Sequence, residues 1–341
     1  LDRSSAASDV YKRQAHDIAV SALQREWAQQ VAATTDGSSA GGGIRVRDVD
    51  PLVTAYLDRL GLDPLSHSGA GSTAGLRALH RAHVERVPYE TVGIALGRPV
   101  GIEPRESAAR IASGWGGYCY HLNGAFGWLL TQLGYAVRFH RGGVHQSVAV
   151  PARALGATGN HVALTVAVEG HTWLVDVGLG DGLWEPLPLM PGRWRQGPNG
   201  PTEFVLRRSD AERDGWRLDH DPWAQSFAGM DFVTAVSGAD LAEFEVMHAE
   251  LSSDPASMFV RWVVVVRRDA DSITRVRNCL VTHLNRDRIH SEVIRDRETW
   301  WSLVETLGLA PEKLSASERA ALWMRLDASQ RAWEERVAKD R

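Results

Sequence analysis

Cysteine is scarce in this chain, with Cys119 and Cys279 the only two among 341 residues. A long chain with so few cysteines is unlike a disulfide-stabilised secreted domain, so we expect reduced thiols and a cytoplasmic protein. No apolar run approaches the length of a membrane span, and the run from Trp262 to Val266 has only the length of a strand. The start of the sequence lacks the apolar core of a signal peptide. We therefore expect no membrane association.

The chain also lacks a large excess of positively or negatively charged residues. The chain has 38 Lys and Arg against 42 Asp and Glu, which gives a formal net charge of −4. This balance leaves no electrostatic footprint for nucleic acid, so we expect no nucleic-acid partner. Hydrophobic residues make up 44% of the chain, enough for a sizeable core, and the length favours two or three domains.

The first 47 residues are expected to lie outside the fold. Leu1 to Gln14 resembles translated adaptor sequence of the kind found at the ends of metagenomic gene fragments. Ala15 to Ala33 can form a short helix, and Thr34 to Gly43 has the composition of a flexible linker. We predict a disordered leader and linker over residues 1–47.

Local signals predict helices before about residue 135 and mostly strands after it. Asp50-Pro51 is an N-cap and N1 pair for a helix that ends at Gly61, and Ser315 with Glu318 forms a capping box for a last helix through Val337. Two further helices are expected at 73–87 and 104–113. Strands are expected at 136–141, 143–150, 161–168, 171–177, 203–208, 259–267 and 275–282, with mixed structure at 216–223 and 240–251. Several short strands in sequence suggest a small barrel or a strongly twisted sheet.

No metal site is predicted. His80 and His83 stand three residues apart on the helix over 73–87, a spacing that suits a metal. No nearby cysteine or second acidic–histidine pair completes a ligand set, so we expect a solvated helix face there.

The chain is organised around a glycine-rich turn that leads into Cys119. The turn reads Gly114-Trp115-Gly116-Gly117-Tyr118-Cys119, and apolar residues then recur at helical spacing through Leu133. This pattern places Cys119 at the first turn of a helix, where unpaired N–H groups and the helix dipole favour an anion. A thiolate is the nucleophilic form of cysteine, so Cys119 is a candidate nucleophile. The alternative is a small buried hydrophobic residue, as most free cysteines are.

A predicted hairpin supplies a candidate base. A turn at Glu169-Gly170 pairs Val168 with His171, and continuing this register gives uniformly apolar pairs on one face. On the opposite face His161 lies across from Gly178 and diagonal to Asp176. A shift of one residue would put the two side chains on opposite faces. A His–Asp pair orients the imidazole, and with Cys119 it would complete a Cys–His–Asp triad. A purely structural hydrogen bond at a strand end is the alternative.

These motifs resemble the arylamine N-acetyltransferases. The resemblance rests on Gly116-Gly117-Tyr118-Cys119 with Asn123, on Asn160-His161, and on Trp173 to Gly178 with Gly180. Weaker matches lie upstream and downstream, at Pro88-Tyr89-Glu90, Leu96 to Pro99, Gly134-Tyr135, Val144, Pro186 to Leu189 and Ser253 to Phe259.

The resemblance implies an α+β fold: an N-terminal helical bundle over 48–135 carrying the nucleophilic cysteine, a central β-barrel over 136–238 carrying the histidine and aspartate, and a C-terminal α/β lid with a last helix over 239–341, around a papain-like cysteine catalytic core. It implies acetyl-CoA as co-substrate and a ping-pong reaction in which Cys119 is acetylated, His161 moves protons and Asp176 holds His161. An arylamine, hydrazine or N-hydroxyarylamine would accept the acetyl group. Tyr89, Val144 and Leu179 would bind substrate, and Gly180 would lie beside the thioester arm of CoA.

Two positions depart from the family pattern. Trp115 stands where the family usually has an arginine, and His121 where it has a glutamate. In relatives that arginine pairs with the glutamate matching Glu90, so we expect Glu90 to lack its partner. The position of His121 can face the helix exterior.

Other functions share these parts. A related amide synthase or other acyl-thioester transferase would keep the triad and change the acyl donor or acceptor. A cysteine peptidase or transglutaminase-like hydrolase would use the same groups on water. A non-catalytic binding module would follow if Trp115 disabled the thiolate. The residues give no oligomeric state beyond a monomer or weak homo-oligomer.

Overall fold

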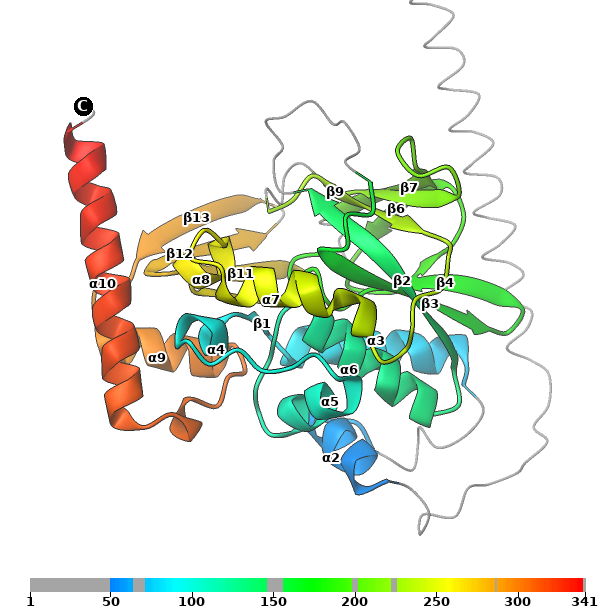
Figure 1. Cartoon of the computed structure of the whole chain (residues 1–341), viewed down its shortest axis with the longest axis horizontal. Helices are drawn as coiled ribbons and strands as arrows, with labels where there is room; N and C mark the ends of the chain where they lie inside the picture. The colour runs from blue at the N-terminus through cyan, green and yellow to red at the C-terminus, as the bar shows by residue number, and fades with distance from the viewer. Residues whose placement is uncertain are drawn as a thin grey trace, which may run out of the picture.

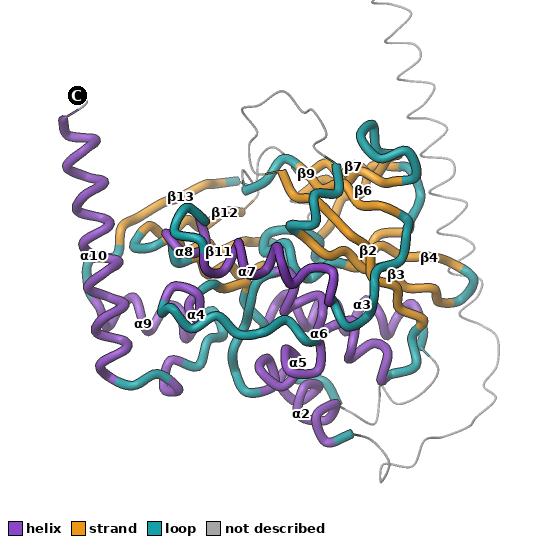
Figure 2. Tube along the Cα trace, viewed as in Figure 1, coloured by secondary structure: helices purple, strands orange, loops and turns teal. Residues whose placement is uncertain are grey.

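A computed structural model describes residues 50–63, 71–145, 156–197, 202–221, 226–285 and 287–339. The expected leader over 1–47, with its helix and linker, lies outside the described residues, as do residues 146–150 and 222–223 of two expected segments. Within the described ranges, the helices and strands gather into separate regions (Figures 1 and 2).

Helices form the lower part of the molecule in Figure 1. They are α2 (Pro51–Arg59), α3 (Thr73–Arg86), the short α4 (Val92–Ala95), α5 (Pro104–Ala112) and α6 (Cys119–Gln132). The predicted Asp50 cap is present, because its side chain accepts a hydrogen bond from the Leu52 N–H at 2.9 Å. Helix α6 lies at the centre, and all of its residues from Cys119 to Gly127 are buried. The cysteine at its start is therefore fixed by the whole helical core.

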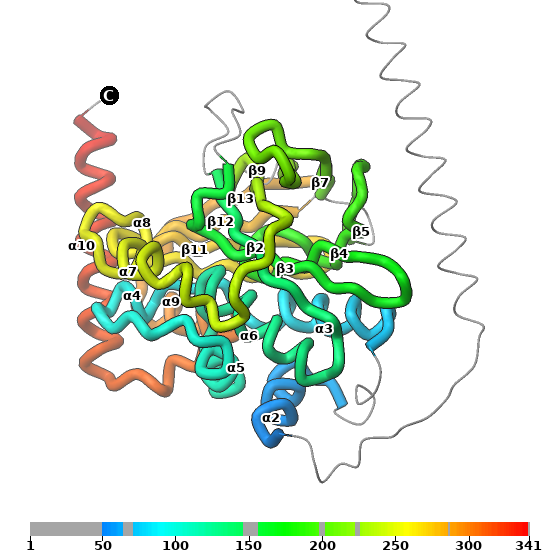
Figure 3. Tube along the Cα trace, turned by 45° about the vertical axis from the view of Figure 1, so that its right-hand side comes forward, coloured from blue at the N-terminus to red at the C-terminus, as the bar shows by residue number. Residues whose placement is uncertain are grey.

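An eight-stranded antiparallel sheet lies against this bundle in a barrel-like curve (Figures 1 and 3). Its order is β5 (Leu187–Pro188), β4 (His171–Val175), β3 (His161–Val168), β2 (Ala136–His145), β9 (Gly229–Val233), β8 (Gly215–Asp219), β7 (Thr202–Arg208) and β6 (Gly192–Gln196).

The β3–β4 hairpin has the predicted register. Val168 pairs with His171, Val166 with Trp173 and Leu164 with Val175. These apolar residues belong to one cluster with the apolar side of α6, whereas Ala163 and Leu174 on the other face pack inside the barrel-like sheet. Glu169 and Gly170 both have positive φ, at 50° and 75°, as a tight two-residue turn requires.

A second, five-stranded sheet covers the site from the other side. Its order is β1 (Tyr89–Glu90), β10 (Val264–Arg268), β11 (Ser272–Arg277), β12 (Leu280–Asn285) and β13 (Arg288–Val293). One side of this sheet is covered by helices α9 (Arg297–Thr306) and α10 (Ala316–Lys339), and the short η4 (Pro311–Lys313) precedes α10. Three further elements run between the two sheets (Figures 1 and 3): η3 (Ala242–Phe244), α7 (Glu245–Ser253) and α8 (Met258–Arg261). The predicted α+β class is confirmed, and the three domain boundaries remain predictions.

Several local predictions are wrong. Residues 275–282 form two strands with a turn at Asn278, whose φ of 52° a short polar side chain tolerates. Residues 259–267 begin as helix α8, which Ser257 caps through a hydrogen bond from the Phe259 N–H. Strand β2 runs unbroken from Ala136 to His145, where two strands were expected. Gly143 marks a close approach of two segments, since a Cβ there would lie 2.2 Å from the Gly156 carbonyl oxygen. Strands β6, β9 and β13 and helix α9 are additional elements.

The predicted solvated face at His80 and His83 is also wrong. Both side chains are fully buried. His80 lies between the backbone carbonyls of Trp184 and Asp176, and His83 contacts the Tyr56 hydroxyl at 2.8 Å. They are core residues because α3 packs under the hairpin that carries Asp176. Over the described ranges, no group of three His, Cys, Asp or Glu side chains is placed to hold a metal ion. No described helix is long and apolar enough to cross a bilayer.

Candidate active site

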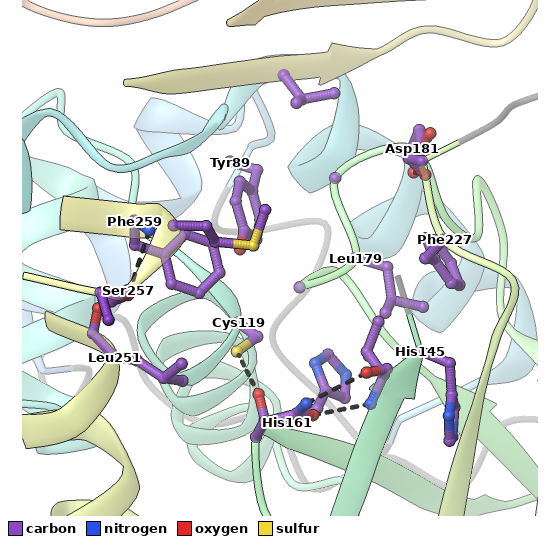
Figure 4. A pocket seen from close by; sticks show the side chains of 18 residues that line it. Tyr89, Cys119, His145, His161, Leu179, Asp181, Phe227, Leu251, Ser257 and Phe259 are labelled. Carbon is purple, nitrogen blue, oxygen red and sulfur yellow. Dashed lines mark hydrogen bonds between the residues drawn. The ribbon is translucent and has the colours of Figure 1, made fainter. Parts of the chain in front are cut away.

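Cys119 is the first residue of α6 and lies at the wall of a cavity. Its side chain is 4% exposed, and Sγ lies 3.6 Å from the carbonyl oxygen of Asn160 (Figure 4). Tyr118 is the N-cap residue and makes no side-chain cap hydrogen bond, so the first N–H groups of α6 are not capped by a side chain there. The backbone of Gly178 packs against this point, since a Cβ at Gly178 would lie 2.9 Å from Cα of Cys119. The predicted helix start is confirmed.

His161 and Asp176 meet on the predicted face of the hairpin. Nε2 of His161 lies 2.7 Å from Oδ2 of Asp176, and both side chains are buried. Burial acts to lower the pKa of His161, but the Asp176 carboxylate and the neighbouring Cys119 sulfur outweigh it and raise this pKa to about 10. With Nε2 directed at Asp176, Nδ1 is the nitrogen left for the sulfur. The structure therefore brings the three predicted catalytic residues together.

Asn123 supports Asp176 from one turn further along α6. Its Nδ2 donates to Oδ1 of Asp176 at 2.9 Å and to the Val162 carbonyl at 2.7 Å, and its Oδ1 accepts from the Val177 N–H. The Gly178 N–H also donates to Oδ1 of Asp176. No role for Asn123 was predicted from the sequence. The available signal was a polar residue four positions after Cys119, on the same face of an otherwise apolar helix.

The cavity beside the sulfur has a volume of about 610 Å³. Tyr89, Val144, Leu179 and Gly180, the four residues expected to contact substrate and the thioester arm, all line it. Gly180 has a φ of 72°, and a Cβ there would contact Tyr89 and Val266 at 3.5 Å, so the backbone passes close to the β1–β10 pair. Their part in binding remains a prediction.

The opposite wall comes from the segment that precedes β10. Leu251, Ser257, Met258 and Phe259 line the cavity. Figure 4 shows Leu251, Ser257 and Phe259 on the side opposite Leu179 and His145. Residues 256–259 lie within the Ser253 to Phe259 segment that carried a weak family match. His145, Asp181, Phe227 and Val266 complete much of the lining, and sequence reasoning missed them because they come from four separate elements. Apolar rings and aliphatic chains around a few polar groups suit a small aromatic ligand.

Glu90 has a partner, contrary to the expectation from Trp115. Nη2 of Arg110, on α5, lies 2.8 Å from Oε1 of Glu90, whose side chain is 1% exposed. The Val92 N–H donates to Oε2 at 2.6 Å. The missing arginine of the loop is therefore replaced by an arginine that reaches the same carboxylate from the preceding helix.

His121 does not face the helix exterior. Its side chain is buried between the Tyr118 and His248 rings, 3.4 Å from the Val100 carbonyl. Burial, with the nearby Arg110 and His248, lowers the pKa of His121 to about 3. The histidine is therefore a neutral core residue beneath the turn that leads to Cys119.

The site combines a thiol at a helix N-terminus, a buried imidazole hydrogen-bonded to a carboxylate, and an open cavity on the sulfur. Such a group can form a covalent acyl intermediate and move the protons that this requires. The geometry alone does not choose between an amine and water as the group that accepts the acyl chain.

The chain is similar to several proteins of known activity. The N-acetyltransferase family model matches residues 72–310. An arylamine N-acetyltransferase / N-hydroxyarylamine O-acetyltransferase of Salmonella typhimurium is 32% identical over 180 residues, 51% of this chain and 59% of the relative. Proansamycin X synthase of Amycolatopsis mediterranei is 35% identical over 149 residues, 41% of this chain and 53% of the relative. The matches thus span little more than half the length of these two proteins.

Solved structures share the fold over most of their length. The M. smegmatis arylamine N-acetyltransferase has a TM-score of 0.70 at 25% identity, over 81% of this chain and 98% of that one. The Mycobacterium marinum arylamine N-acetyltransferase in complex with CoA has a TM-score of 0.69 at 24% identity, over 81% and 98% of the two chains. The similarity to the M. marinum structure shows that the two proteins share a fold.

Proposed function

Because the chain belongs to the arylamine N-acetyltransferase family, we propose that it moves an acetyl group from acetyl-CoA to an arylamine, a hydrazine or an N-hydroxyarylamine. The observation that carries the proposal is the meeting of Cys119, His161 and Asp176 at the wall of a cavity sized for a small aromatic ligand. The CoA complex of the M. marinum relative supports CoA as the donor's leaving group. The protein acts in the cytoplasm as a monomer or weak homo-oligomer, without a bound metal.

The first half-reaction acetylates the enzyme. The Cys119 sulfur attacks the carbonyl carbon of the thioester, while His161 holds the proton that left the thiol. The tetrahedral intermediate collapses, the bond to the CoA sulfur breaks, and His161 returns the proton to that sulfur. Free CoA and an acetyl thioester on Cys119 result. Asp176 stabilises the imidazolium throughout, as the raised pKa of His161 indicates.

The second half-reaction transfers the acetyl group. The amine nitrogen attacks the acetyl carbon, the carbon–sulfur bond breaks, and His161 takes the surplus proton from the nitrogen and returns it to Cys119. Tyr89, Val144 and Leu179 hold the aromatic ring in the cavity, and Gly180 leaves space for the thioester arm beside Tyr89. The amide leaves, and the thiol is restored.

Mass spectrometry tests the first half-reaction directly. Purified protein mixed with acetyl-CoA should gain one acetyl group, and peptide mapping should place it on Cys119. Adding an arylamine such as aniline should remove the group and yield acetanilide. No mass gain would contradict the acetyltransferase. Rapid release of free acetate without an amine would indicate a hydrolase instead.

An acyl donor other than acetyl is the second candidate, favoured by the 35% identity to Proansamycin X synthase. The same triad serves any acyl thioester, so the cavity decides chain length. Acyl-CoA substrates of increasing length, compared by kcat/KM, separate the candidates. A maximum at acetyl supports the first proposal, and a maximum at a longer acyl chain supports the second.

A further inference from the structure

We propose that Arg110 is a positioning residue for Cys119, an inference that rests on the proposed role of this thiol. Arg110 lies near the end of α5, nine residues before the cysteine. Its guanidinium joins the turn that leads to Cys119 to the strand residue Glu90. Arg110 therefore sets where the sulfur stands relative to His161 without touching substrate.

One guanidinium makes three contacts, each to a different part of this region. Nη2 lies 2.8 Å from Oε1 of Glu90, and Nε donates to the Gly116 carbonyl oxygen at 3.0 Å. The guanidinium carbon lies 4.9 Å from the centre of the Trp115 ring, a cation–π distance. An arginine fork can satisfy a carboxylate and a carbonyl together, which a lysine cannot do in the same geometry.

The turn and the Glu90 strand are in direct contact, so a shift of one moves the other. The Glu90 N–H donates to the Gly117 carbonyl at 2.9 Å, and Tyr89 forms a bridge with Gly117. A Cβ on Gly116 would lie 2.0 Å from the Pro88 carbonyl oxygen, which leaves no room between the two segments. Tyr89 is also a wall of the cavity. The Arg110 contact thus fixes both the approach to Cys119 and one side of the binding space.

Trp115 packs between the Arg110 guanidinium and an apolar cluster. Its ring packs against the cluster formed by Val263, Val265 and α9, and its face receives the Arg110 guanidinium. The tryptophan that replaces the family arginine therefore becomes the surface on which the substitute arginine is stacked. Glu90 is almost fully buried, so removing the guanidinium leaves its carboxylate without its cation and allows the turn to move.

Alkylation of Cys119 by iodoacetamide tests the inference without acetyl-CoA or an amine. Arg110→Met should lower the alkylation rate at pH 7 and shift its pH profile. It should also lower kcat for acetyl transfer by about 100-fold while changing KM for the amine less, since a small displacement of the sulfur affects the chemical step first. Arg110→Lys should fall between wild type and Arg110→Met. Arg105→Ala is the matched control, because Arg105 lies on the same helix with an exposed side chain and pairs with Asp50.

A double-mutant cycle with Glu90→Gln separates positioning from general stability. The double variant Glu90→Gln/Arg110→Met should lose no more alkylation rate than Arg110→Met alone, because both changes break one contact. Independent, multiplying losses would overturn the inference, as would an Arg110→Lys variant with wild-type alkylation and kcat. If Arg110→Met does not fold, the Arg110→Lys comparison decides. A wild-type protein that alkylates rapidly yet transfers no acetyl group would refute the proposed function and leave this comparison valid.

Discussion

The two cysteines of this chain are both buried and yet lie in opposite chemical settings. Cys119 begins a helix, borders a cavity and has an imidazole beside its sulfur. Cys279 sits in the turn between β11 and β12, is 1% exposed and packs among apolar residues of the five-stranded sheet and of helices α9 and α10. Burial is common to both, so burial does not make a nucleophile. The difference lies in what surrounds the sulfur.

The surroundings of Cys279 oppose ionisation. Burial, with the nearby carboxylates of Asp327 and Glu334, raises its pKa to about 11, and Arg295 offsets this only in part. A thiol of this kind is inert at neutral pH. Cys279 thus provides an internal reference for Cys119, and each prediction below tests whether the contrast between the two settings holds.

The largest expected effect comes from removing each sulfur in turn. Cys119→Ala should reduce acetyl transfer by about 10⁶-fold, the scale seen when a catalytic nucleophile is lost. Cys279→Ala should keep kcat within twofold and lower the unfolding free energy by about 1 kcal/mol, because it removes one atom from a packed core. Steady-state kinetics measure kcat for both variants, and urea unfolding measures their free energies of unfolding. Comparable losses from both variants would break the contrast.

Replacing the carboxylate behind His161 should have the next largest effect. Asp176→Asn keeps the shape and removes the charge that raises the pKa of His161, so transfer should fall by about 10⁴-fold. The amide can also place a donor toward Nε2 and favour the wrong tautomer. Stopped-flow rates of the first half-reaction measure the loss. A variant with near wild-type rates would show that the imidazole does not depend on this carboxylate.

Features with a local physical signal were predictable from the sequence. The hairpin register followed from the apolar pairs between 161–168 and 171–177, and the start of α6 from glycines before an apolar helix. Both depend on neighbours close in sequence. The turn at Asn278 was not predicted, because Asn-Cys is not one of the standard two-residue turn signals, although the φ of Asn278 is positive.

Contacts between segments that are distant in the sequence could not be predicted from local patterns. The Arg110–Glu90 pair joins residues 20 apart, and the cavity wall combines β2, the segment before β9, α8 and β10. Nothing local indicates that His121 is covered by the Tyr118 and His248 rings, since His248 arrives from a helix 127 residues later. A pattern reports which face of an element is apolar. It does not report which side chain of another element will cover it.

Histidines repeat the contrast between the two cysteines. His161 gains a carboxylate, and its pKa rises to about 10. His80 is buried on α3 between backbone carbonyls, and burial lowers its pKa to about 4 despite these contacts. The pKa shifts of His161 and His80 therefore have opposite signs. The contribution of His161 to stability is complete below pH 6.5 and is lost as the pH rises toward 10, whereas that of His80 is complete above pH 6.5 and is lost as the pH falls toward 4.

The protonation of His80 at acid pH should have a smaller effect than the Cys119 and Asp176 substitutions. Between pH 6.5 and 4 the unfolded chain binds a proton at residue 80 that the folded protein excludes, so folding loses about 2 kcal/mol at pH 5 relative to pH 7 from this group. His80→Gln should remove that part of the pH dependence in urea unfolding at the two pH values. His290→Gln, at an exposed position on β13, should keep the wild-type difference. An unchanged difference in His80→Gln would mean that the buried imidazole takes up its proton in the folded state, and the histidines would then no longer parallel the cysteines.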